Sequence, residues 1–452
     1  MTRDLSTIIK AYDVRGLCPG ELDADIARAL GAAFALFTGS DRIVVARDMR
    51  ETGIELSRAF ADGVTSQGVD VVDAGLGSTD LLYYAAGTLD VPGAMFTASH
   101  NPARYNGIKL CLSGARPVGQ DSGLAQLRED AERYLDEGLP ESDREKGSVT
   151  EQDLLAGYAS YMKELVPGIE DIRPLRVVVD AGNGMGGHTV PAVFEGLPLE
   201  VTEMFFELDG SFPNHEANPI DPANTADLQA KVAELGADIG LAFDGDADRC
   251  FVIDERGEIV SPSVLTALIA ARELAKRPGS TIIHNLITSK AVPEAVTENG
   301  GTPVRTRVGH SFIKAEMART GAVFGGEHSG HFYFAEFWNA DSGMLAALHA
   351  LAALGGQDGT LSQLLTTYDR YAASGEINST VDDQAARIAA IKQRYAGRPQ
   401  DELDGLTVEL EGGAWFNVRA SNTEPLLRLN VEAPDVATME RVRDEVLAVI
   451  RG

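Results

Sequence analysis

The sequence predicts an α/β protein made of three α/β units followed by one smaller α+β unit. Short apolar runs typical of buried strands alternate with amphipathic stretches typical of helices as far as residue 324. The alternation restarts after a polar, charged stretch at 141–148, which indicates a domain boundary. The C-terminal part differs, because strand-like runs follow one another there and a single amphipathic helix closes the chain.

The expected elements follow from the periodicity of apolar residues. In the α/β units we expect a helix at 53–66 and strands at 42–46, 69–72, 91–96, 108–112, 175–179, 239–243, 281–283 and 322–324. In the α+β unit we expect strands at 406–410, 414–418 and 426–431, and a helix with one face made of Val436, Met439, Val442, Val446 and Val449. The corresponding domains are expected at residues 1–149, 150–253, 254–366 and 367–452.

The composition is that of a globular protein with several cores. A chain of 452 residues is too long for one core, and its 44% hydrophobic and 24% charged residues are ordinary. Three widely spaced cysteines form neither a disulfide framework nor a zinc motif. We find neither a signal-peptide core nor a run of about 18 apolar residues, so a cytoplasmic enzyme is expected.

The net charge limits the possible partners. A formal charge of −29 argues against nucleic acid and against an anionic membrane, since both require a basic surface. A small anionic substrate is still compatible with this charge, because a local pocket of Arg and Lys outweighs distant, screened charges.

An acidic loop, Asp244-Gly-Asp-Ala-Asp-Arg249, is the strongest local signal. It follows a buried strand, and ligand sites of α/β proteins lie at the carboxyl ends of strands. Three carboxylates at i, i+2 and i+4 can converge on one hard cation, and all-oxygen ligands favour Mg²⁺. The alternative is a solvated acidic turn. Arg249 beside such a loop suits a phosphate group.

A serine loop, Thr97-Ala-Ser-His-Asn-Pro102, is the second signal. Adjacent Ser and His rarely share a catalytic hydrogen bond, and no Gly-x-Ser-x-Gly elbow is present, so a hydrolase triad is not predicted. The alternative is a strand-to-loop turn that uses Ser and Asn as turn formers.

A glycine-flanked loop, Gly325-Gly-Glu-His-Ser-Gly-His331, is the third signal. Its hydrogen-bond donors and acceptors suit sugar hydroxyls. The alternative is an ordinary glycine turn.

A polar loop, Arg419-Ala-Ser-Asn-Thr-Glu-Pro425, with Arg428 downstream, is the fourth signal. An arginine, two hydroxyls, an amide and backbone N–H groups form a phosphate cradle. The alternative is a polar hairpin turn.

A further run, Gly182-Asn-Gly-Met-Gly-Gly187, matches the dinucleotide-binding pattern G-x-G-x-x-G after a strand, with Glu203 about 20 residues on. A nucleotide-dependent oxidoreductase is therefore an alternative. The glycines are equally explained by a tight turn and close helix packing.

Together, the four motifs in this order resemble the α-D-phosphohexomutase family, and most closely its phosphomannomutase/phosphoglucomutase branch. The resemblance begins at Lys10-Ala-Tyr-Asp-Val-Arg-Gly16, similar to the family's Tyr-Asp-x-Arg-Gly, and ends at Arg419–Pro425. It therefore covers nearly the whole chain, and it makes the glycine run a structural turn of the second domain.

The resemblance implies three α/β domains with mixed sheets and a C-terminal α+β domain, arranged around a central cleft. In chain order these would be a phosphoserine domain, a metal-binding domain, a sugar-recognition domain and a phosphate-binding domain. The implied reaction interconverts hexose 1-phosphate and hexose 6-phosphate through a phosphoserine and a hexose 1,6-bisphosphate, which is also the implied activator. The resemblance implies mannose as the preferred hexose and glucose as the second choice.

The family's functional residues map onto this chain by motif. Ser99 would be the phosphoserine, and its phosphate would complete a Mg²⁺ site made by Asp244, Asp246 and Asp248. The sugar hydroxyls would bind Glu327, Ser329 and His331. The non-reacting phosphate would bind Arg419, Ser421, Asn422, Thr423 and Arg428. The cleft would be lined by Tyr12, Arg15, His100, Lys109, Arg249, Gly309 and His310. The general base is left open among His310, His100 and Lys109.

Two departures from the family pattern affect specificity. At the third-domain strand end, Asn285-Leu-Ile-Thr-Ser-Lys290 has Ile287 where many relatives carry a cation, and Lys290 is the candidate replacement. His328 stands where Gln is common in phosphoglucosamine mutases, which weakens that alternative. A non-catalytic sugar-phosphate sensor is the remaining alternative. Sugar phosphates are the expected partners of a monomer or dimer.

Overall fold

The computed structural model describes residues 3–10, 12–421 and 425–452. Two compact units divide the chain: Met1–Val260 with Ser329–Leu364, and Ser261–His328 with Leu365–Gly452. We call them the first and the second unit and describe each by itself. Among the described residues, no helix has the length and apolar character needed to cross a bilayer.

A mixed sheet begins the first unit. Its strands are β1 Val14–Leu17, β2 Arg42–Arg47, β3 Asp70–Leu76, β4 Gly93–Phe96, β5 Tyr105–Leu112, β6 Arg116–Pro117 and β7 Val149–Glu151. They are ordered β1-β5-β4-β2-β3-β7, with β6 beside β5. The central pairs β4–β2–β3 are parallel, whereas β5 is antiparallel to both of its neighbours in this order. Because β7 pairs with β3, this sheet extends past residue 149, where the sequence places the first boundary.

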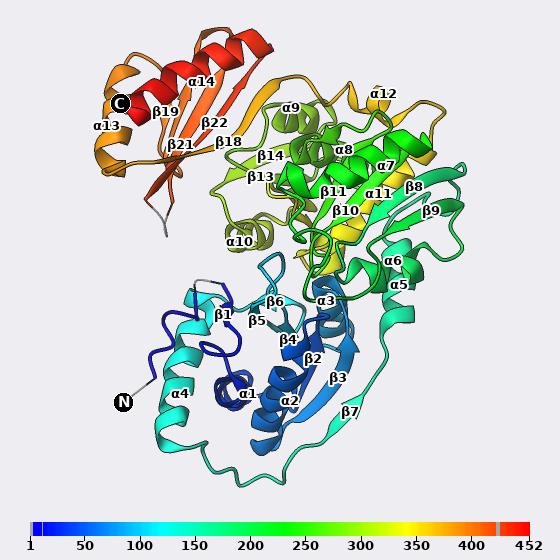
Figure 1. Ribbon diagram of the computed structural model, residues 1–452, viewed down its shortest axis with the longest axis vertical. Coiled ribbons are helices and arrows are strands. Elements are labelled where there is room, and N and C mark those ends of the chain that lie inside the picture. Colours follow the sequence, from blue (N-terminus) through cyan, green and yellow to red (C-terminus); the bar gives the residue numbers. More distant parts are fainter. Residues whose placement is uncertain (1–2, 11, 422–424) are drawn as a thin grey trace. The chain divides into compact units, whose positions relative to one another are not determined.

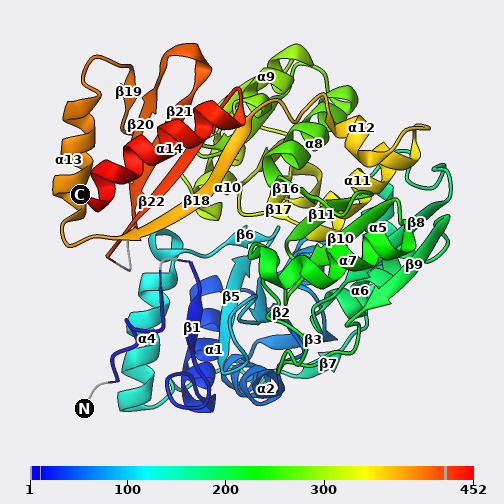
Figure 2. The same ribbon diagram turned by 45° about the horizontal axis from the view of Figure 1, so that its top comes forward.

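Helices cover this sheet. They are α1 Ala24–Thr38, α2 Glu51–Ser66, α3 Thr79–Thr88 and α4 Leu124–Glu137. Figures 1 and 2 show α1 beside α2. α1 begins where the side chain of Asp23 accepts from the N–H of Ile26, and it ends at Gly39 in the left-handed region (φ 60°). Phe60 of α2 packs edge-on against Phe96 of β4, so the strand that leads into the serine loop is anchored in the core.

A second mixed sheet follows in the first unit. Its strands are β8 Leu175–Asp180, β9 Leu199–Met204, β10 Ile239–Phe243, β11 Cys250–Asp254 and β12 Ile259–Val260. They are ordered β12-β11-β10-β8-β9, and the predicted strand 239–243 matches β10 residue for residue. The other elements of this unit are α5 Leu155–Glu164, α6 Gly186–Phe194, α7 Ala226–Leu235, β16 Phe332–Phe334, β17 Ala340–Asp341 and α11 Gly343–Gly355.

The glycine run lies between β8 and α6, as a dinucleotide site would require. However, its glycines are explained by backbone packing. A Cβ on Gly184 would lie 2.7 Å from the carbonyl oxygen of Gly245, and one on Gly187 would overlap the carbonyl oxygen of Phe206. The turn therefore requires glycines without any ligand, which favours the structural interpretation of this motif.

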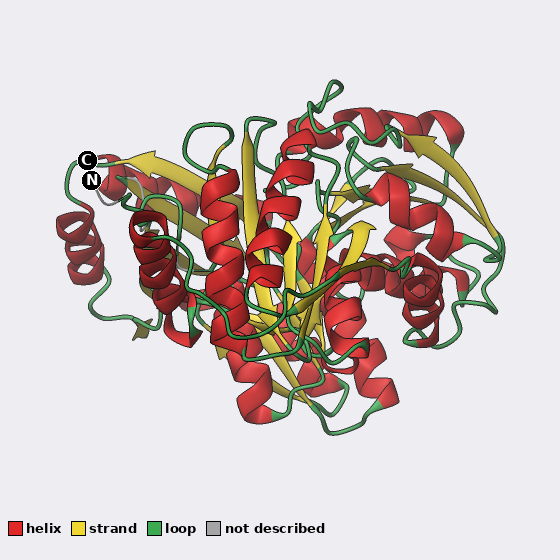
Figure 3. Ribbon diagram, turned by 90° about the horizontal axis from the view of Figure 1, so that it is seen from below, coloured by secondary structure: helices red, strands yellow, loops and turns green. Residues whose placement is uncertain are grey.

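The second unit starts with three parallel strands in the order β14-β13-β15. The strands are β13 Thr281–Asn285, β14 Thr302–Thr306 and β15 Phe324–Gly326. The helices are α8 Pro262–Lys276, α9 Ala291–Glu298 and α10 His310–Thr320, and α12 Leu361–Leu365 lies at the boundary between the units in sequence. Helices and strands alternate along the chain here. Figure 3 colours the helices of the whole protein red and its strands yellow.

The C-terminal part of the second unit is an antiparallel sheet with helices beside it. Its strands are β18 Ala372–Thr380, β19 Gln400–Asp401, β20 Leu406–Glu409, β21 Trp415–Ala420 and β22 Leu426–Ala433, in the order β18-β22-β21-β20-β19. The helices are α13 Gln384–Arg394 and α14 Val436–Arg451. These sheets confirm the predicted fold class, three α/β parts and an α+β end.

The predicted buried face of α14 needs one correction. Met439, Val442 and Val446 are buried as expected, but Val436 is 60% exposed. Val436 is the first residue after the N-cap Asp435, so it lies before the turn that reaches the sheet. Ile450 is fully buried and completes the face instead.

Candidate active site

The acidic loop connects β10 to β11 in the first unit, at the carboxyl end of a fully buried strand. The carboxylates of Asp244, Asp246 and Asp248 are at most 1% exposed. Each offers an oxygen, and these oxygens lie within 4.8 Å of one another. Three negative charges that lie this close together and are buried away from water require compensation by positive charge.

Two basic side chains supply part of that compensation. Lys109 Nζ lies 2.7 Å from Asp246 Oδ2 and 2.6 Å from Asp248 Oδ2. Arg249 donates to Asp244 Oδ2 from Nε at 3.0 Å and lies 2.9 Å from it through Nη2. The second oxygens of Asp246 and Asp248 are buried and have no hydrogen-bond partner among the described residues. These two oxygens, with the nearby Asp244, form an oxygen donor set that fits Mg²⁺.

The loop's ionisation reflects burial and ion pairing. Burial raises the pKa of Asp244 to about 7, although Arg249 opposes the shift. For Asp246 burial acts in the same direction, but the ion pair with Lys109 outweighs it and lowers the pKa. Burial alone would lower the pKa of Lys109, yet Asp246 and Asp248 raise it well above its usual value. Lys109 is therefore a permanent cation here.

Ser99 contacts the acidic loop directly. Its hydroxyl donates to Asp244 Oδ2 at 2.9 Å, and its Oγ lies 3.1 Å from His100 Nδ1. Ser99 has a φ of 48°, a region that few residues other than glycine occupy. A methyl group on Gly245 would overlap the carbonyl oxygen of Ser99, so the two loops touch backbone to backbone.

His100 acts as an acceptor in this cluster. Its Nδ1 lies 2.6 Å from Arg249 Nη2, which can only donate. Burial first, and then the charge of Arg249, lower the pKa of His100 to about 2. The imidazole is therefore neutral, with its Nδ1 lone pair directed at Arg249 and Ser99.

Arg50 is a functional residue that the sequence reasoning missed. It is 2% exposed and pairs with the fully buried Asp48 through Nε at 3.2 Å. Its Nη atoms donate to three main-chain carbonyls of the serine loop, those of Ser99, Asn101 and Pro102, and to that of Tyr105 at the start of β5, at 2.7–3.0 Å. The guanidinium thus holds the loop in shape. The sequence signal that could have revealed Arg50 is the pair of charged residues, Asp48 and Arg50, just after the buried strand β2.

The sequence reasoning also did not predict that the first turn of α3 contacts the acidic loop. The N–H of Thr79 donates to the carbonyl of Asp246 at 3.0 Å, and its hydroxyl donates to Asp246 Oδ2 at 2.6 Å. Next to it, Asp80 is fully buried and accepts from the hydroxyls of Ser78 and Ser342. Burial raises the pKa of Asp80 to about 7. This turn ties α3 to the acidic loop.

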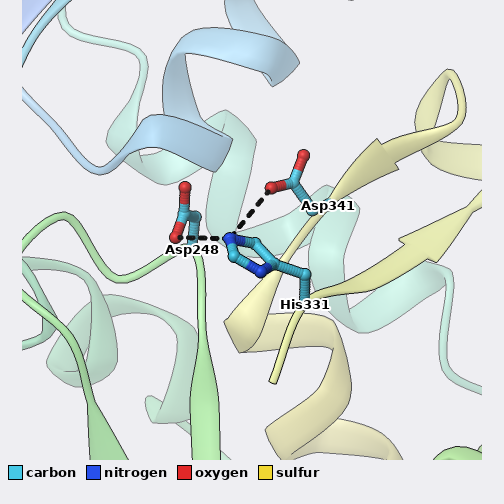
Figure 4. Close-up of side chains that lie close together, drawn as sticks. All are labelled: Asp248, His331 and Asp341. Carbon is cyan, nitrogen blue, oxygen red and sulfur yellow. Dashed lines mark ion pairs between the residues drawn. The ribbon is translucent and has the colours of Figure 1, made fainter. Parts of the chain in front are cut away.

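His331, from the glycine-flanked loop at 325–331, lies beside the acidic loop. Figure 4 shows its ring between Asp248 and Asp341, with Nε2 at 3.8 Å from Asp248 Oδ1 and 4.0 Å from Asp341 Oδ2. Its Nδ1 lies 2.9 Å from the hydroxyl of Ser329, which fixes the ring. Both distances to the carboxylates exceed hydrogen-bond length. The imidazole therefore faces the acidic loop without forming a hydrogen bond to these carboxylates.

The N-terminal motif also reaches the serine loop. Arg15 Nη1 donates to the carbonyl of Ala98 at 3.3 Å and to the side chain of Asn101. Tyr12 in the same motif is 38% exposed. The first unit thus brings together these site residues predicted from sequence: Arg15, Ser99, His100, Lys109, Asp244, Asp246, Asp248, Arg249, Ser329 and His331.

The other predicted residues lie in the second unit. Glu327 is 3% exposed just after β15, and Gly309 (φ 132°) is the N-cap of α10. Arg419 on β21 pairs with Glu376, and the N–H of Ser421 donates to the carbonyl of Leu426 at 2.9 Å. Asn422 and Thr423 lie outside the described residues, as does the side chain of His310.

The two residues of the third-domain departure line different cavities. Ile287 lines a cavity of about 230 Å³ together with His328 and Asn430. Lys290 lines another cavity of about 260 Å³ with Arg305 and Glu409. A role for Lys290 as the missing cation therefore stays a prediction.

A buried serine beside carboxylates that could hold a metal ion, in an α/β protein, is the arrangement that phosphoryl-transfer enzymes use. The comparisons with known proteins agree. Four models described as phosphoglucomutase/phosphomannomutase match the chain: alpha/beta/alpha domain I at residues 6–134, domain II at 156–257, domain III at 262–371 and the C-terminal domain at 376–449.

Similar proteins cover the chain from end to end. A phosphomannomutase of Salmonella montevideo is 40% identical over 99% of each chain. A phosphoglucomutase of Neisseria gonorrhoeae is 37% identical over 100% of this chain and 98% of its own. The crystal structure of a phosphoglucomutase/phosphomannomutase family protein from Burkholderia thailandensis has a TM-score of 0.87 at 34% identity, covering 100% of this chain and 98% of the other.

The chain belongs to the phosphoglucomutase/phosphomannomutase family and is a phosphohexomutase. The family is magnesium-dependent, and the acidic loop of this chain offers three carboxylates that could hold such an ion.

Proposed function

We propose that this phosphohexomutase interconverts hexose 1-phosphate and hexose 6-phosphate, with mannose as its preferred sugar and glucose as the second. The phosphate would pass through Ser99 and a hexose 1,6-bisphosphate, which also serves as activator. The observation that carries the proposal is the 2.9 Å hydrogen bond from the Ser99 hydroxyl to Asp244 Oδ2. It puts the proposed phosphate acceptor against the carboxylates that bind the metal.

The first transfer moves phosphorus from Ser99 Oγ to a free sugar hydroxyl. The new O–P bond forms as the Oγ–P bond breaks, and a base takes the proton of the sugar hydroxyl. Mg²⁺ held by Asp244, Asp246, Asp248 and a phosphoserine oxygen would neutralise charge on the transferring group. Lys109 and Arg249, both fixed by ion pairs, add positive charge on the protein side.

The second transfer reverses these bonds at the other phosphate. The bisphosphate turns over between the two steps, so one reactive end serves both positions of the sugar. Ser99 Oγ, in its hydroxyl form, then attacks, and its proton has an acceptor in reach, Asp244 Oδ2 at 2.9 Å. Arg419, Ser421, Asn422, Thr423 and Arg428 would hold whichever phosphate is not reacting.

The proton on the sugar hydroxyl needs a base with an available lone pair. Lys109 is held protonated by two carboxylates, and His100 has a pKa of about 2 with its Nδ1 engaged by Arg249. These environments favour His310 over both among the sequence candidates. His331, whose Nε2 faces the acidic loop, is a second candidate from the geometry.

The remaining assignments complete the proposal. Glu327, Ser329 and His331 would recognise sugar hydroxyls, and Tyr12, Arg15, Lys290 and Gly309 would line the substrate's path. The four domain ranges, 1–149, 150–253, 254–366 and 367–452, carry the phosphoserine, metal, sugar and phosphate roles. The enzyme would act in the cytoplasm as a monomer or dimer.

A phosphorus NMR assay tests the proposal. Mannose, glucose and glucosamine 1-phosphates are offered in turn with Mg²⁺ and a trace of the matching bisphosphate. The expected result is conversion to the 6-phosphates, with the highest kcat/KM for mannose and the lowest for glucosamine. Phosphopeptide mass spectrometry should place the phosphate on Ser99. Conversion without a phosphoserine, or a preference for glucosamine, contradicts the proposal.

A further inference from the structure

Two arginines at the polar loop 419–425 lie opposite each other on two paired strands. Arg419 on β21 and Arg428 on β22 are direct partners in the antiparallel register. Like charges directly opposite each other destabilise a sheet unless something neutralises them. The position therefore has a cost that some other group must offset.

Glu376 on the neighbouring strand β18 is that group. Its Oε2 lies 3.0 Å from Arg419 Nη2, and its Oε1 lies 3.4 Å from Arg428 Nη1. In the register, Glu376 pairs with Asn430, two residues from Arg428 on the same face of β22. One carboxylate thus spans both guanidinium groups.

The arginines have hydrogen-bonding capacity left. The Nε atoms of Arg419 and Arg428 are buried and, within the described part of the chain, have no hydrogen-bond partner. The Arg419 side chain is only 12% exposed, whereas Glu376 and Arg428 are 25% and 33% exposed. The cluster is therefore partly exposed, and its donors exceed what one carboxylate can use.

We propose that Glu376 is a resident competitor for the phosphate of the substrate. When no phosphate is bound, the carboxylate of Glu376 keeps the two guanidinium groups aligned. When phosphate is bound, the carboxylate repels it and so favours its release. The inference rests on the proposed function, in which the bisphosphate must leave this cradle and return reversed. Two arginines without a competing carboxylate would hold a phosphate dianion more tightly, and tight binding of an intermediate slows its reorientation.

The alternative is a purely structural ion pair. In that case removing the carboxylate would weaken the sheet and disorder the arginines, so phosphate binding would weaken with it. As a competitor, Glu376 would have the opposite effect on phosphate affinity. The sign of the change therefore separates the two roles.

The test compares Glu376→Gln with the native chain. The control, Glu402→Gln, removes the same charge from an ion pair with Lys392 at a residue that is 60% exposed. Inorganic phosphate is the probe in a direct binding titration, and KM and kcat are measured separately with the preferred hexose 1-phosphate. For Glu376→Gln we expect about tenfold tighter phosphate binding, with KM and kcat both lowered. The control should leave all three unchanged.

Thermal unfolding guards against a folding defect. Glu376→Gln should unfold at a lower temperature than the native chain without phosphate, and saturating phosphate should close most of that gap. Glu376→Asp keeps the charge at a shorter reach and should fall between the two proteins in phosphate affinity. A raised KM with unchanged or weaker phosphate binding in Glu376→Gln would overturn the inference. Absence of mutase activity in the native enzyme would instead contradict the proposed function, while the phosphate titration still reports on Glu376.

Discussion

Ser99 donates a hydrogen bond to Asp244 across 145 residues of sequence, and this contact joins the serine loop to the metal loop. The serine comes from the carboxyl end of β4 and the aspartate from the carboxyl end of β10. Two separate sheets of the first unit therefore each contribute one residue of this contact.

Ser99→Ala should abolish turnover. Without Oγ there is no atom to carry the phosphate, so kcat should fall by at least about a thousandfold, and added hexose 1,6-bisphosphate should not restore it. Steady-state kinetics with and without bisphosphate measure the effect, and Ser57→Ala on the exposed side of α2 is the control. Near-native turnover of Ser99→Ala would refute the phosphoserine assignment.

Removal of the metal should stop the reaction as well. Chelation with EDTA is expected to eliminate activity, and added Mg²⁺ should restore it, because the second oxygens of Asp246 and Asp248 are buried without a hydrogen-bond partner among the described residues. Asp246→Asn should raise the Mg²⁺ concentration needed for half-maximal activity. Full activity in EDTA would show that the loop is not a catalytic metal site.

Arg50→Met should lower stability strongly. It leaves the fully buried Asp48 without its cation and frees the carbonyls of Ser99, Asn101, Pro102 and Tyr105, which together cost about 3 kcal/mol or more in the free energy of unfolding. Urea unfolding measures the loss, with Arg144→Met at a 53% exposed ion pair as the control. A loss equal to that of the control would mean that Arg50 does not hold the loop.

Asp80→Asn should stabilise the protein more at pH 8 than at pH 4. Burial raises the folded pKa of Asp80 from 3.8 to about 7, so the unfolded chain loses this proton first. The contribution of Asp80 to stability therefore decreases as pH rises from about 4 to 7, and the neutral amide avoids that decrease. Urea midpoints across this range, beside those of Asp25→Asn at a 70% exposed site, check the prediction. A gain that does not change with pH would contradict it.

Much of the fold was predictable because its central strands are buried on both faces. β10 is a continuous apolar run that no helix pattern matches, and the prediction for it was correct at both ends. β14 and β18 were not predicted, since their residues are mostly polar or partly exposed and lack the apolar signal. Their place is set by pairing with β13 and β22 rather than by their own sequence.

The residues of the candidate site also fall into two groups, those that local sequence predicted and those that it did not. Residues in compact motifs, such as Ser99 and Asp244, were predicted from local sequence, although their contact was not. Arg50, Thr79 and Glu376 carry no motif of their own. Their significance comes from partners 49, 167 and 43 residues away in the chain, which only the folded structure brings close.

Gly245 sits within the metal loop, yet its missing side chain matters for the serine loop, because any Cβ there would strike the carbonyl oxygen of Ser99. The three aspartates could all be retained in a variant with a larger residue at this position, and the metal could still bind. Ser99 would nevertheless have to shift away from Asp244. The distance between the two loops therefore depends on the absence of one methyl group as well as on the set of charged side chains.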